Sequence, residues 1–334
     1  MSDVLEEYLT AIAVGDRAGA LDLVRRLQRA GASPLEVMTD VIAPAQARVG
    51  ELWATDAWSV AQEHAATAVS EAVLGMLGAQ IPAPLDTARP VVVSCVEQEW
   101  HALPALLVAE HLRSAGIPVS YLGANASAEH LVRHVHEVAP RAVALSCSLS
   151  ASLPRVRRQI EAVRATGTPV VVGGAAFDAG GRRAEALGAT GFAVSGALAV
   201  QALRAQGSAT VPAEPLSGPG PEEGFAIHAD REQLTATLKE RVATARPAAT
   251  LQDVVSGWQP VLFDHLPHLV GAVAGALVAA DSTVVEEAVV WLDGVMSHRD
   301  APRGVTDVVV TELRKLVREY PSASDLLSVL PAAG

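Results

Sequence analysis

The stretch PVVVSCVEQEWHALP, residues 90–104, places a run of apolar β-formers directly before a cluster of reactive side chains. The run is typical of a strand buried on both faces, as in the parallel sheets of α/β proteins. Its end carries Glu97, Glu99, Trp100 and His101, where most buried strands end in a short polar turn. Such side chains can bind a metal or move a proton, so the stretch predicts both a fold and a site.

Four more apolar stretches of this kind follow, separated by segments in which apolar residues recur at helical spacing. The stretches are IPVSYLG, AVALSCS, PVVVGG and GFAVS, and all lie within residues 88–210. Strands that alternate with helices indicate a flavodoxin-like (Rossmann-type) α/β domain with five parallel strands in the order 2-1-3-4-5. In this order ligands bind where strands 1 and 3 end. We therefore expect EQEWHALP and SCSLSAS to face one site.

The segment before the α/β domain is predicted to be a four-helix bundle over residues 1–82. It contains four stretches with helical periodicity, and their short connections imply antiparallel neighbours. Asp16, Ser33 and Ser59 stand where N-capping residues are expected. IPAPLDTARP, residues 81–90, is predicted to link the bundle to the sheet.

The segment after the α/β domain is predicted to be all-helical. Residues 211–224 are rich in Pro and Gly and are interpreted as a linker. Residues 225–334 show helical periodicity without a clear strand. Gly271 and Gly275, one helical turn apart, would let another element approach closely. The chain is thus expected to combine α and α/β domains.

The composition excludes several function classes. Lys and Arg number 25 against 37 Asp and Glu, which gives a net charge of -12. Without a basic patch, nucleic acid is not an expected partner. The chain lacks a signal-peptide pattern, and its longest apolar run, residues 269–280, is too short to span a bilayer. Cys95 and Cys147 fall in predicted strands and are expected to be reduced. We expect a soluble, cytoplasmic protein without a membrane partner.

Glu99 and His101 have the spacing of a metal-binding histidine and its carboxylate partner. The carboxylate accepts a proton from one ring nitrogen, which leaves the other nitrogen free for a metal. The alternative is an ordinary loop histidine that pairs with a neighbouring acid. Two further motifs follow along the chain: Ser146 and Ser148 at the end of the third strand, and the pair Gly173-Gly174 at the end of the fourth.

These three ordered motifs resemble the cobalamin-binding domain family, whose pattern is Asp/Glu-x-His-x-x-Gly, then Ser-x-Leu, then Gly-Gly. The resemblance implies that His101 is the lower cobalt ligand and replaces the cofactor's own base. It also implies that Glu99 and Ser146 form a hydrogen-bonded relay behind that ligand. Gly173 and Gly174 would let the backbone approach the nucleotide tail.

Two positions depart from the family pattern. Pro104 replaces the Gly of the first motif, so a backbone N–H contact is not available there. Ser148 replaces the Leu of the second motif. Neither change removes the predicted cobalt ligand, His101.

The bundle carries a second group of candidate residues in WATDAWSVAQEH: Trp53, Glu63 and His64. A tight turn between two helices would bring them to one pocket; the alternative is an interfacial Trp with a solvated Glu-His pair. The spacing resembles the cap of B12-dependent light-sensing regulators. That resemblance implies that Trp53 packs on the upper face of the cofactor, beside the 5′-deoxyadenosyl group, with Glu63 and His64 nearby. Ala54 stands where some of these relatives have a cobalt-binding His.

The third group, His265, His268, Arg299 and Arg303, lies in the C-terminal helices. The order of helical cap, cobalamin domain and helical C-terminal domain resembles the photocobilins. That resemblance implies a globin-like domain that holds biliverdin, with arginines and histidines near its propionates and pyrrole nitrogens. Residues 225–334 contain no cysteine, so the bilin would be non-covalent. The alternative is a helical dimerisation module.

We therefore expect a photoreceptor, not an enzyme, that binds adenosylcobalamin and responds to light by a change in domain packing or oligomeric state. No DNA-binding helix-turn-helix is expected before the bundle. The expected partners are the small-molecule chromophores, further copies in a homo-oligomer, and a partner enzyme or signalling chain. Two alternatives remain: a corrinoid methyl-carrier subunit of a methyltransferase, and an interaction protein without a cofactor.

Overall fold

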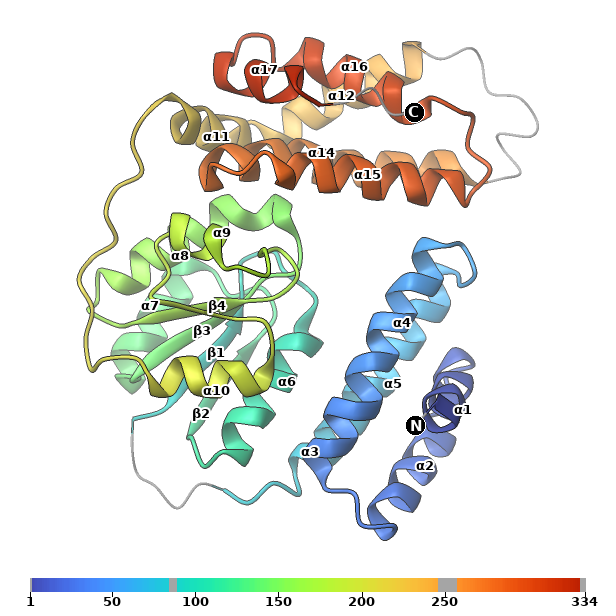
Figure 1. Cartoon of the computed structure of the whole chain (residues 1–334), viewed down its shortest axis with the longest axis vertical. Coiled ribbons are helices and arrows are strands. Elements are labelled where there is room, and N and C mark those ends of the chain that lie inside the picture. Colours follow the sequence, from blue (N-terminus) through green and yellow to red (C-terminus); the bar gives the residue numbers. More distant parts are fainter. Residues whose placement is uncertain (1, 84–88, 246–256, 331–334) are drawn as a thin grey trace.

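A five-stranded parallel sheet occupies the middle of the chain (Figure 1). The computed structural model describes residues 2–83, 89–245 and 257–330, so the predicted linker 81–90 lies partly outside the described residues. The strand order is β2-β1-β3-β4-β5, which confirms the predicted order. The strands are β1 (Val91–Cys95), β2 (Val119–Gly123), β3 (Ala142–Ser146), β4 (Val170–Gly173) and β5 (Gly191–Ala193).

Helices cover both faces of the sheet, which explains why β1 and β3 are apolar throughout. Alternate residues of β1 point to opposite layers. Val91 and Val93 pack with α6 (Ala102–Ser114) and α10 (Gly196–Arg204). Val92 packs with α7 (Ala128–Val138) and α8 (Leu153–Arg164). A 3-10 turn, η2 (Ser150–Ser152), precedes α8, and α9 (Arg182–Ala186) lies between β4 and β5.

The N-terminal region is a helical bundle with its own apolar core. Asp16, Ser33 and Ser59 cap their helices through side-chain acceptors, as predicted. A π-helical turn interrupts the third predicted helix, because Pro44 has no N–H to continue the α-helical pattern. The elements are α1 (Ser2–Ala13), α2 (Arg17–Arg29), α3 (Pro34–Val37), η1 (Met38–Ile42), α4 (Ala43–Ala54) and α5 (Val60–Gly78).

The C-terminal region is helical in its described residues, as predicted, but its helices begin earlier than expected. The segment interpreted as a linker contains the start of α11 at Pro219, since Pro fits the first turn of a helix. The elements are α11 (Pro219–Ala229), α12 (Arg231–Ala245), α14 (Trp258–Ala279), α15 (Thr283–Ser297), α16 (Val305–Leu316) and α17 (Pro321–Ser328).

Helix α14 forms the core of this region. Within the described residues it is the one helix long and apolar enough to cross a membrane, but 67% of its most apolar window is buried inside the protein. Such burial is typical of a core helix. Helices α11, α12 and α15 pack around it (Figure 1).

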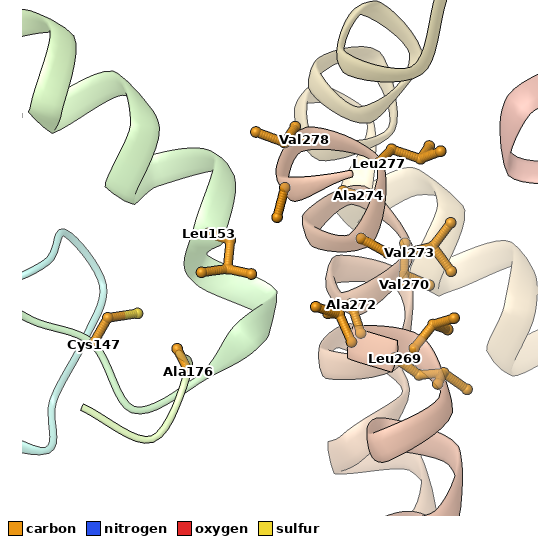
Figure 2. Close-up of a cluster of buried hydrophobic side chains, with 14 of the residues drawn as sticks. Cys147, Leu153, Ala176, Leu269, Val270, Ala272, Val273, Ala274, Leu277 and Val278 are labelled. Atoms are coloured by element: carbon orange, nitrogen blue, oxygen red, sulfur yellow. The ribbon is translucent and has the colours of Figure 1, made fainter. Parts of the chain in front are cut away.

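The spacing of Gly271 and Gly275 predicted a close approach by another element, and in the structure that element is the turn that follows β3. A Cβ at Gly271 would lie 2.7 Å from Cβ of Ala151, and a Cβ at Gly275 would lie 2.6 Å from the carbonyl oxygen of Ser150. Figure 2 shows Leu153 at the start of α8 facing the apolar side chains of α14. The C-terminal region therefore packs closely on the carboxyl end of the sheet.

A buried arginine forms a second attachment between the same two regions. Arg183 of α9 donates to Asp281 and Glu287 at 2.8 Å each and to the hydroxyl of Thr283 at 2.9 Å. Asp281 and Thr283 lie at the turn between α14 and α15. The position of this helical hairpin on the α/β domain is thus fixed at two places.

We expect Gly275→Ala to destabilise the protein by about 1–3 kcal/mol, because the added methyl group has no room against Ser150. Gly294→Ala in α15 is the matched control, since a Cβ there meets nothing within 4 Å. The control should stabilise the helix by up to about 1 kcal/mol. Urea denaturation followed by circular dichroism measures both. Equal stabilisation by the two substitutions would contradict the close contact.

Candidate functional site

The buried carboxylate of Glu99 organises the loop between β1 and α6. Oε1 accepts hydrogen bonds from the backbone N–H of His101 at 3.1 Å and from Nδ1 of the same residue at 2.5 Å. Oε2 accepts from the backbone N–H groups of Ser148 at 2.7 Å and Leu149 at 3.2 Å. Glu99 therefore joins the loops that follow β1 and β3, the two strands at the predicted switch point.

The hydrogen bonds that Glu99 accepts favour its ionised form. Burial alone would raise the pKa of the Glu99 carboxyl, but hydrogen bonds from His101 and from the Ser148 backbone lower it below its usual value. The pKa of His101 is raised, chiefly by the hydrogen bond to Glu99 and, to a smaller extent, by the charge of Glu63.

The tautomer of His101 follows from these bonds. An ionised carboxylate only accepts hydrogen bonds, so Nδ1 carries a proton and the neutral ring has a free lone pair on Nε2. The side chain is 56% exposed, so that nitrogen is accessible. His101 occupies the N-cap position of α6 without a capping bond from its side chain, and α6 begins at Ala102, two residues before Pro104.

The predicted relay has a different composition in the structure. The bonds to Glu99 from the β3–α8 loop come from the backbone of Ser148 and Leu149. Ser146, predicted as the relay partner, is the last residue of β3, two residues before Ser148, and lines a cavity. The bonds that this loop makes to Glu99 therefore come from main-chain N–H groups, which do not depend on the side chain at position 148.

The predicted glycine pair lies at the end of β4, beside the same cavity. A Cβ at Gly173 would lie 2.4 Å from the carbonyl oxygen of Ala193. A Cβ at Gly174, whose φ is +110°, would lie 2.3 Å from the carbonyl oxygen of Cys147. Side chains are therefore excluded at both positions, and the backbone itself forms the wall.

The cavity has a volume of about 360 Å³ and lies between the sheet, α6, α10 and the bundle. Its lining is mostly apolar, with Thr39 of the bundle and His111 of α6 among the polar residues. Oγ1 of Thr39 lies 3.2 Å from Nε2 of His111. An elongated group that enters between β3 and β4 would be surrounded by the ends of the strands.

Glu63 and His64 lie side by side at the start of α5. Nδ1 of His64 pairs with one carboxylate oxygen of Glu63, and the other oxygen accepts from Thr67 at 3.1 Å. The His64 side chain is 74% exposed. Because the charge of Glu63 acts on His101, the start of α5 lies within electrostatic range of the predicted cobalt ligand.

Trp53, at the end of α4, packs against the C-terminal region, a partner that the sequence did not predict. Its ring stacks on Trp291 with 5.9 Å between centroids and lies 5.5 Å from His265. The guanidinium of Arg299 lies 5.0 Å from the Trp53 ring centre. The cap and the C-terminal helices thus meet at an aromatic cluster.

The structure corrects the predicted role of Arg299. Its side chain is buried and donates to the backbone carbonyls of Trp53 at 2.7 Å and Ala54 at 3.0 Å. Nε lies 3.6 Å from the carboxylate of Asp56. Arg299 therefore satisfies carbonyl groups at the C-terminal end of α4, instead of offering a free guanidinium to a propionate. Arg303 is exposed, in the turn after α15.

The two histidines of α14 are held neutral. Nδ1 of His265 bonds to the carbonyl of Val261 at 2.6 Å, and burial lowers the pKa of this ring. Burial, followed by His265, lowers the pKa of His268 to about 4. His101 also acts on His268, so this ring lies on the side of α14 that faces the β1–α6 loop.

Sequence reasoning missed Asn125, which positions the Glu99 loop from the end of β2. Its side chain accepts from the backbone N–H of Gln98 at 2.9 Å, and its backbone N–H donates to the Glu99 carbonyl at 3.0 Å. Gln98 and Asn125 both have φ near +60°. The sequence did contain a signal for this residue, because the polar Asn125 comes directly after Gly-Ala at the end of the second predicted strand.

These residues fit a corrinoid cofactor. A corrin surrounds its cobalt with four nitrogens, so the protein needs to supply only an axial ligand, and His101 presents a free nitrogen. No cluster of three or more metal-ligand side chains occurs among the described residues. The Gly173-Gly174 wall and the cavity would hold the nucleotide tail. Trp53 lies on α4 of the bundle, and Glu63 and His64 lie on α5.

Comparisons with known proteins support this interpretation. Residues 4–77 and 89–204 each match a family described as B12 binding domain. The chain is 34% identical over 180 residues to the HTH-type transcriptional repressor CarH of Myxococcus xanthus, a match that covers 53% of this chain and 52% of the repressor. The chain thus spans about half the length of this curated relative.

The fold is similar to that of a monomethylamine corrinoid protein of Methanosarcina barkeri. The TM-score is 0.54 at 18% identity, and the match covers 61% of this chain and 99% of that protein. At this identity the likeness concerns the fold alone. Residues 4–77, which are helical, and residues 89–204, which are α/β, thus each match a B12 binding domain model, and cobalamin is the cofactor that these matches indicate.

Proposed function

We propose that this chain is a light-sensing regulator that binds adenosylcobalamin with His101 as the lower cobalt ligand. One observation carries the proposal: Trp53 of the cap is attached to the C-terminal region through Arg299 and Trp291. A methyl carrier needs no such attachment, whereas a sensor needs a contact that transmits a change at the cofactor.

The chain would position the cofactor from both sides. Adenosylcobalamin, when bound, supplies a cobalt–carbon bond that visible light breaks. Glu99 fixes the ring of His101 and keeps its proton on Nδ1. Trp53, Glu63 and His64 would form the wall on the opposite side of the cofactor. A change in the cofactor group that lies against this wall would alter the contacts of α4 and α5.

The response would pass from the cap to the C-terminal region. Arg299 donates to the carbonyl of Trp53 at the end of α4, and its guanidinium also lies over the face of the Trp53 ring. A shift of Trp53 would therefore break these bonds or move α15 with it, which provides the two-state element that a signal requires. The output would be altered self-association or control of a partner enzyme or signalling chain in the cytoplasm.

The proposal extends to biliverdin as a second, non-covalent chromophore. The support is the cluster of Trp53, Trp291 and the neutral histidines His265 and His268 between the cap and α14. Aromatic walls and neutral ring nitrogens suit a tetrapyrrole.

The main alternative is a corrinoid methyl-carrier subunit, favoured by the fold likeness to the monomethylamine corrinoid protein. Absorption spectra of the protein with adenosylcobalamin, in the dark and then in green light, separate the two functions. A sensor should change its spectrum and its elution volume on illumination. Preference for methylcobalamin, with no change in elution volume after light, would favour the carrier. If the protein binds no cobalamin, the remaining interpretation is an interaction protein without a cofactor.

We expect His101→Ala to weaken cobalamin binding most, because it removes the axial ligand. Glu99→Gln should reduce affinity by about 10–100-fold, since it removes the partner that orients the ring. His130→Ala on the exposed side of α7 is the control and should bind as the wild type does. Binding is measured by titration and by the cobalt absorption bands. Wild-type affinity with an unchanged spectrum in His101→Ala would rule out this ligand.

We expect Arg299→Gln to destabilise the contact between the cap and α15 by about 1–3 kcal/mol, because it leaves the Trp53 and Ala54 carbonyls without their donor. Arg303→Gln changes the charge equally at an exposed position and should stay within about 0.5 kcal/mol. Hydrogen exchange at the end of α4, with and without light, measures the coupling. An unchanged light response in Arg299→Gln would show that the signal takes another route.

Trp53→Ala should reduce the preference for adenosylcobalamin over methylcobalamin by about tenfold or more, because only the larger upper group reaches the cap. Trp58→Ala is the control: Trp58 is partly buried against the bundle core, so its loss should reduce stability without changing the preference. Titration with both cofactors measures the ratio of affinities. Equal losses for the two cofactors in Trp53→Ala would indicate general destabilisation of the bundle.

A further inference from the structure

Two arginines from different regions converge on one neutral oxygen. Arg155, in the first turn of α8, donates to Oε1 of Gln98 at 2.6 Å. Arg231, the first residue of α12, donates to the same oxygen at 3.4 Å. An amide oxygen carries only a partial negative charge. The two guanidinium groups therefore lie close together around a neutral amide oxygen.

The charges of this cluster are not neutralised by direct pairing. Across residues 2–83, 89–245 and 257–330, neither Arg155 and Arg231 nor the neighbouring Arg158 forms an ion pair with a carboxylate. Glu97 and Glu232 act on the arginines only at longer range. Arg155 is 8% exposed, and burial, followed by the charge of Arg231, lowers its pKa to about 10. The arrangement is unfavourable for cations unless a further negative group joins them.

A buried histidine without a partner lies among the same arginines. His228 of α11 is 8% exposed, and its Nδ1 has no hydrogen-bond partner in the described structure. Burial, followed by the charges of Arg155, Arg158 and Arg231, lowers its pKa to about 4. Buried polar atoms are rarely left unsatisfied in folded proteins. A ligand that accepts hydrogen bonds from this cluster would satisfy the ring as well.

We propose that Arg155, Arg231 and His228 form an oxyanion site that takes a carboxylate or a phosphate group. Guanidinium groups match the geometry of both groups through paired N–H donors. Both arginines lie in the first turn of a helix, where the helix dipole adds positive potential. The amide oxygen of Gln98 accepts from both side chains, at a position that an oxygen of an anion could take.

The site would join the α/β domain to the C-terminal region. Arg155 belongs to α8 of the B12-binding domain, whereas His228 and Arg231 belong to α11 and α12. Gln98 lies three residues before His101 on the same loop. A bound anion would therefore strengthen the contact between the α/β domain and the C-terminal region, beside the loop that carries His101. The site is separate from the cavity between the sheet and the bundle and does not depend on the proposed light response.

Thermal unfolding of the full-length, cofactor-free chain tests the site. Inorganic phosphate and succinate are each compared with sodium chloride at equal ionic strength. At saturation we expect the wild type to gain about 2–4 °C in midpoint temperature over chloride. Arg231→Gln should lose this gain. Arg133→Gln, which makes the same charge change on the exposed face of α7, should keep it. No anion-specific gain in the wild type, or an equal gain in Arg231→Gln, would overturn the proposal.

Two further measurements identify the anion and guard against misfolding. Arg231→Lys keeps the charge but loses the paired donors, so its midpoint gain should fall below that of the wild type. Biliverdin and its dimethyl ester are titrated in parallel: preference for the free acid, lost in Arg231→Gln, identifies the carboxylate of a tetrapyrrole. A gain with phosphate or succinate and no uptake of biliverdin identifies a free anion. That outcome would remove the second chromophore from the proposed function and leave the oxyanion site standing.

Discussion

A single buried carboxylate determines how the site is built. Glu99 is fully buried, and a buried charge is costly unless hydrogen bonds replace its water shell. His101 supplies two donors and the backbone of Ser148 and Leu149 supplies two more. The loops after β1 and β3 can therefore adopt their positions only together. The orientation of the His101 ring follows from the same bonds. The hydrogen bonds to Glu99 therefore fix both the direction of the predicted ligand and the positions of the two loops.

The loop after β3 carries this constraint to the C-terminal region. Ser148 and Leu149 bond to Glu99, and the next two residues, Ser150 and Ala151, form the surface on which α14 rests. Helix α14 approaches so closely because it presents glycines at this contact. The C-terminal region is thus connected to the predicted cobalt ligand through the loop after β3 and Glu99. It also contacts Trp53 of the cap. It is the region that contacts both walls of the site.

Local patterns in the sequence predicted most of the fold, and long-range contacts account for what they missed. Apolar runs and helical periodicity gave the strand order and the helical flanks, and capping residues marked the starts of helices. Ser146 was predicted as the hydrogen-bond partner of Glu99, but the donors from the loop after β3 are backbone N–H groups, which no residue type reveals. The bond from Arg299 to the end of α4 joins residues far apart in sequence, and an arginine near aromatic residues is equally typical of an anion site.

The two attachments of the C-terminal region differ in kind, and the difference indicates which part can move. Its contact with the α/β domain combines close helix packing at Gly271 and Gly275 with the buried bonds of Arg183. Packing of this density resists gradual deformation. Its contact with the cap depends on one arginine and a few stacked rings. A disturbance at the cap should therefore separate Trp53 from Arg299 before it displaces α14, so the bundle moves against an α/β domain and C-terminal region that stay together.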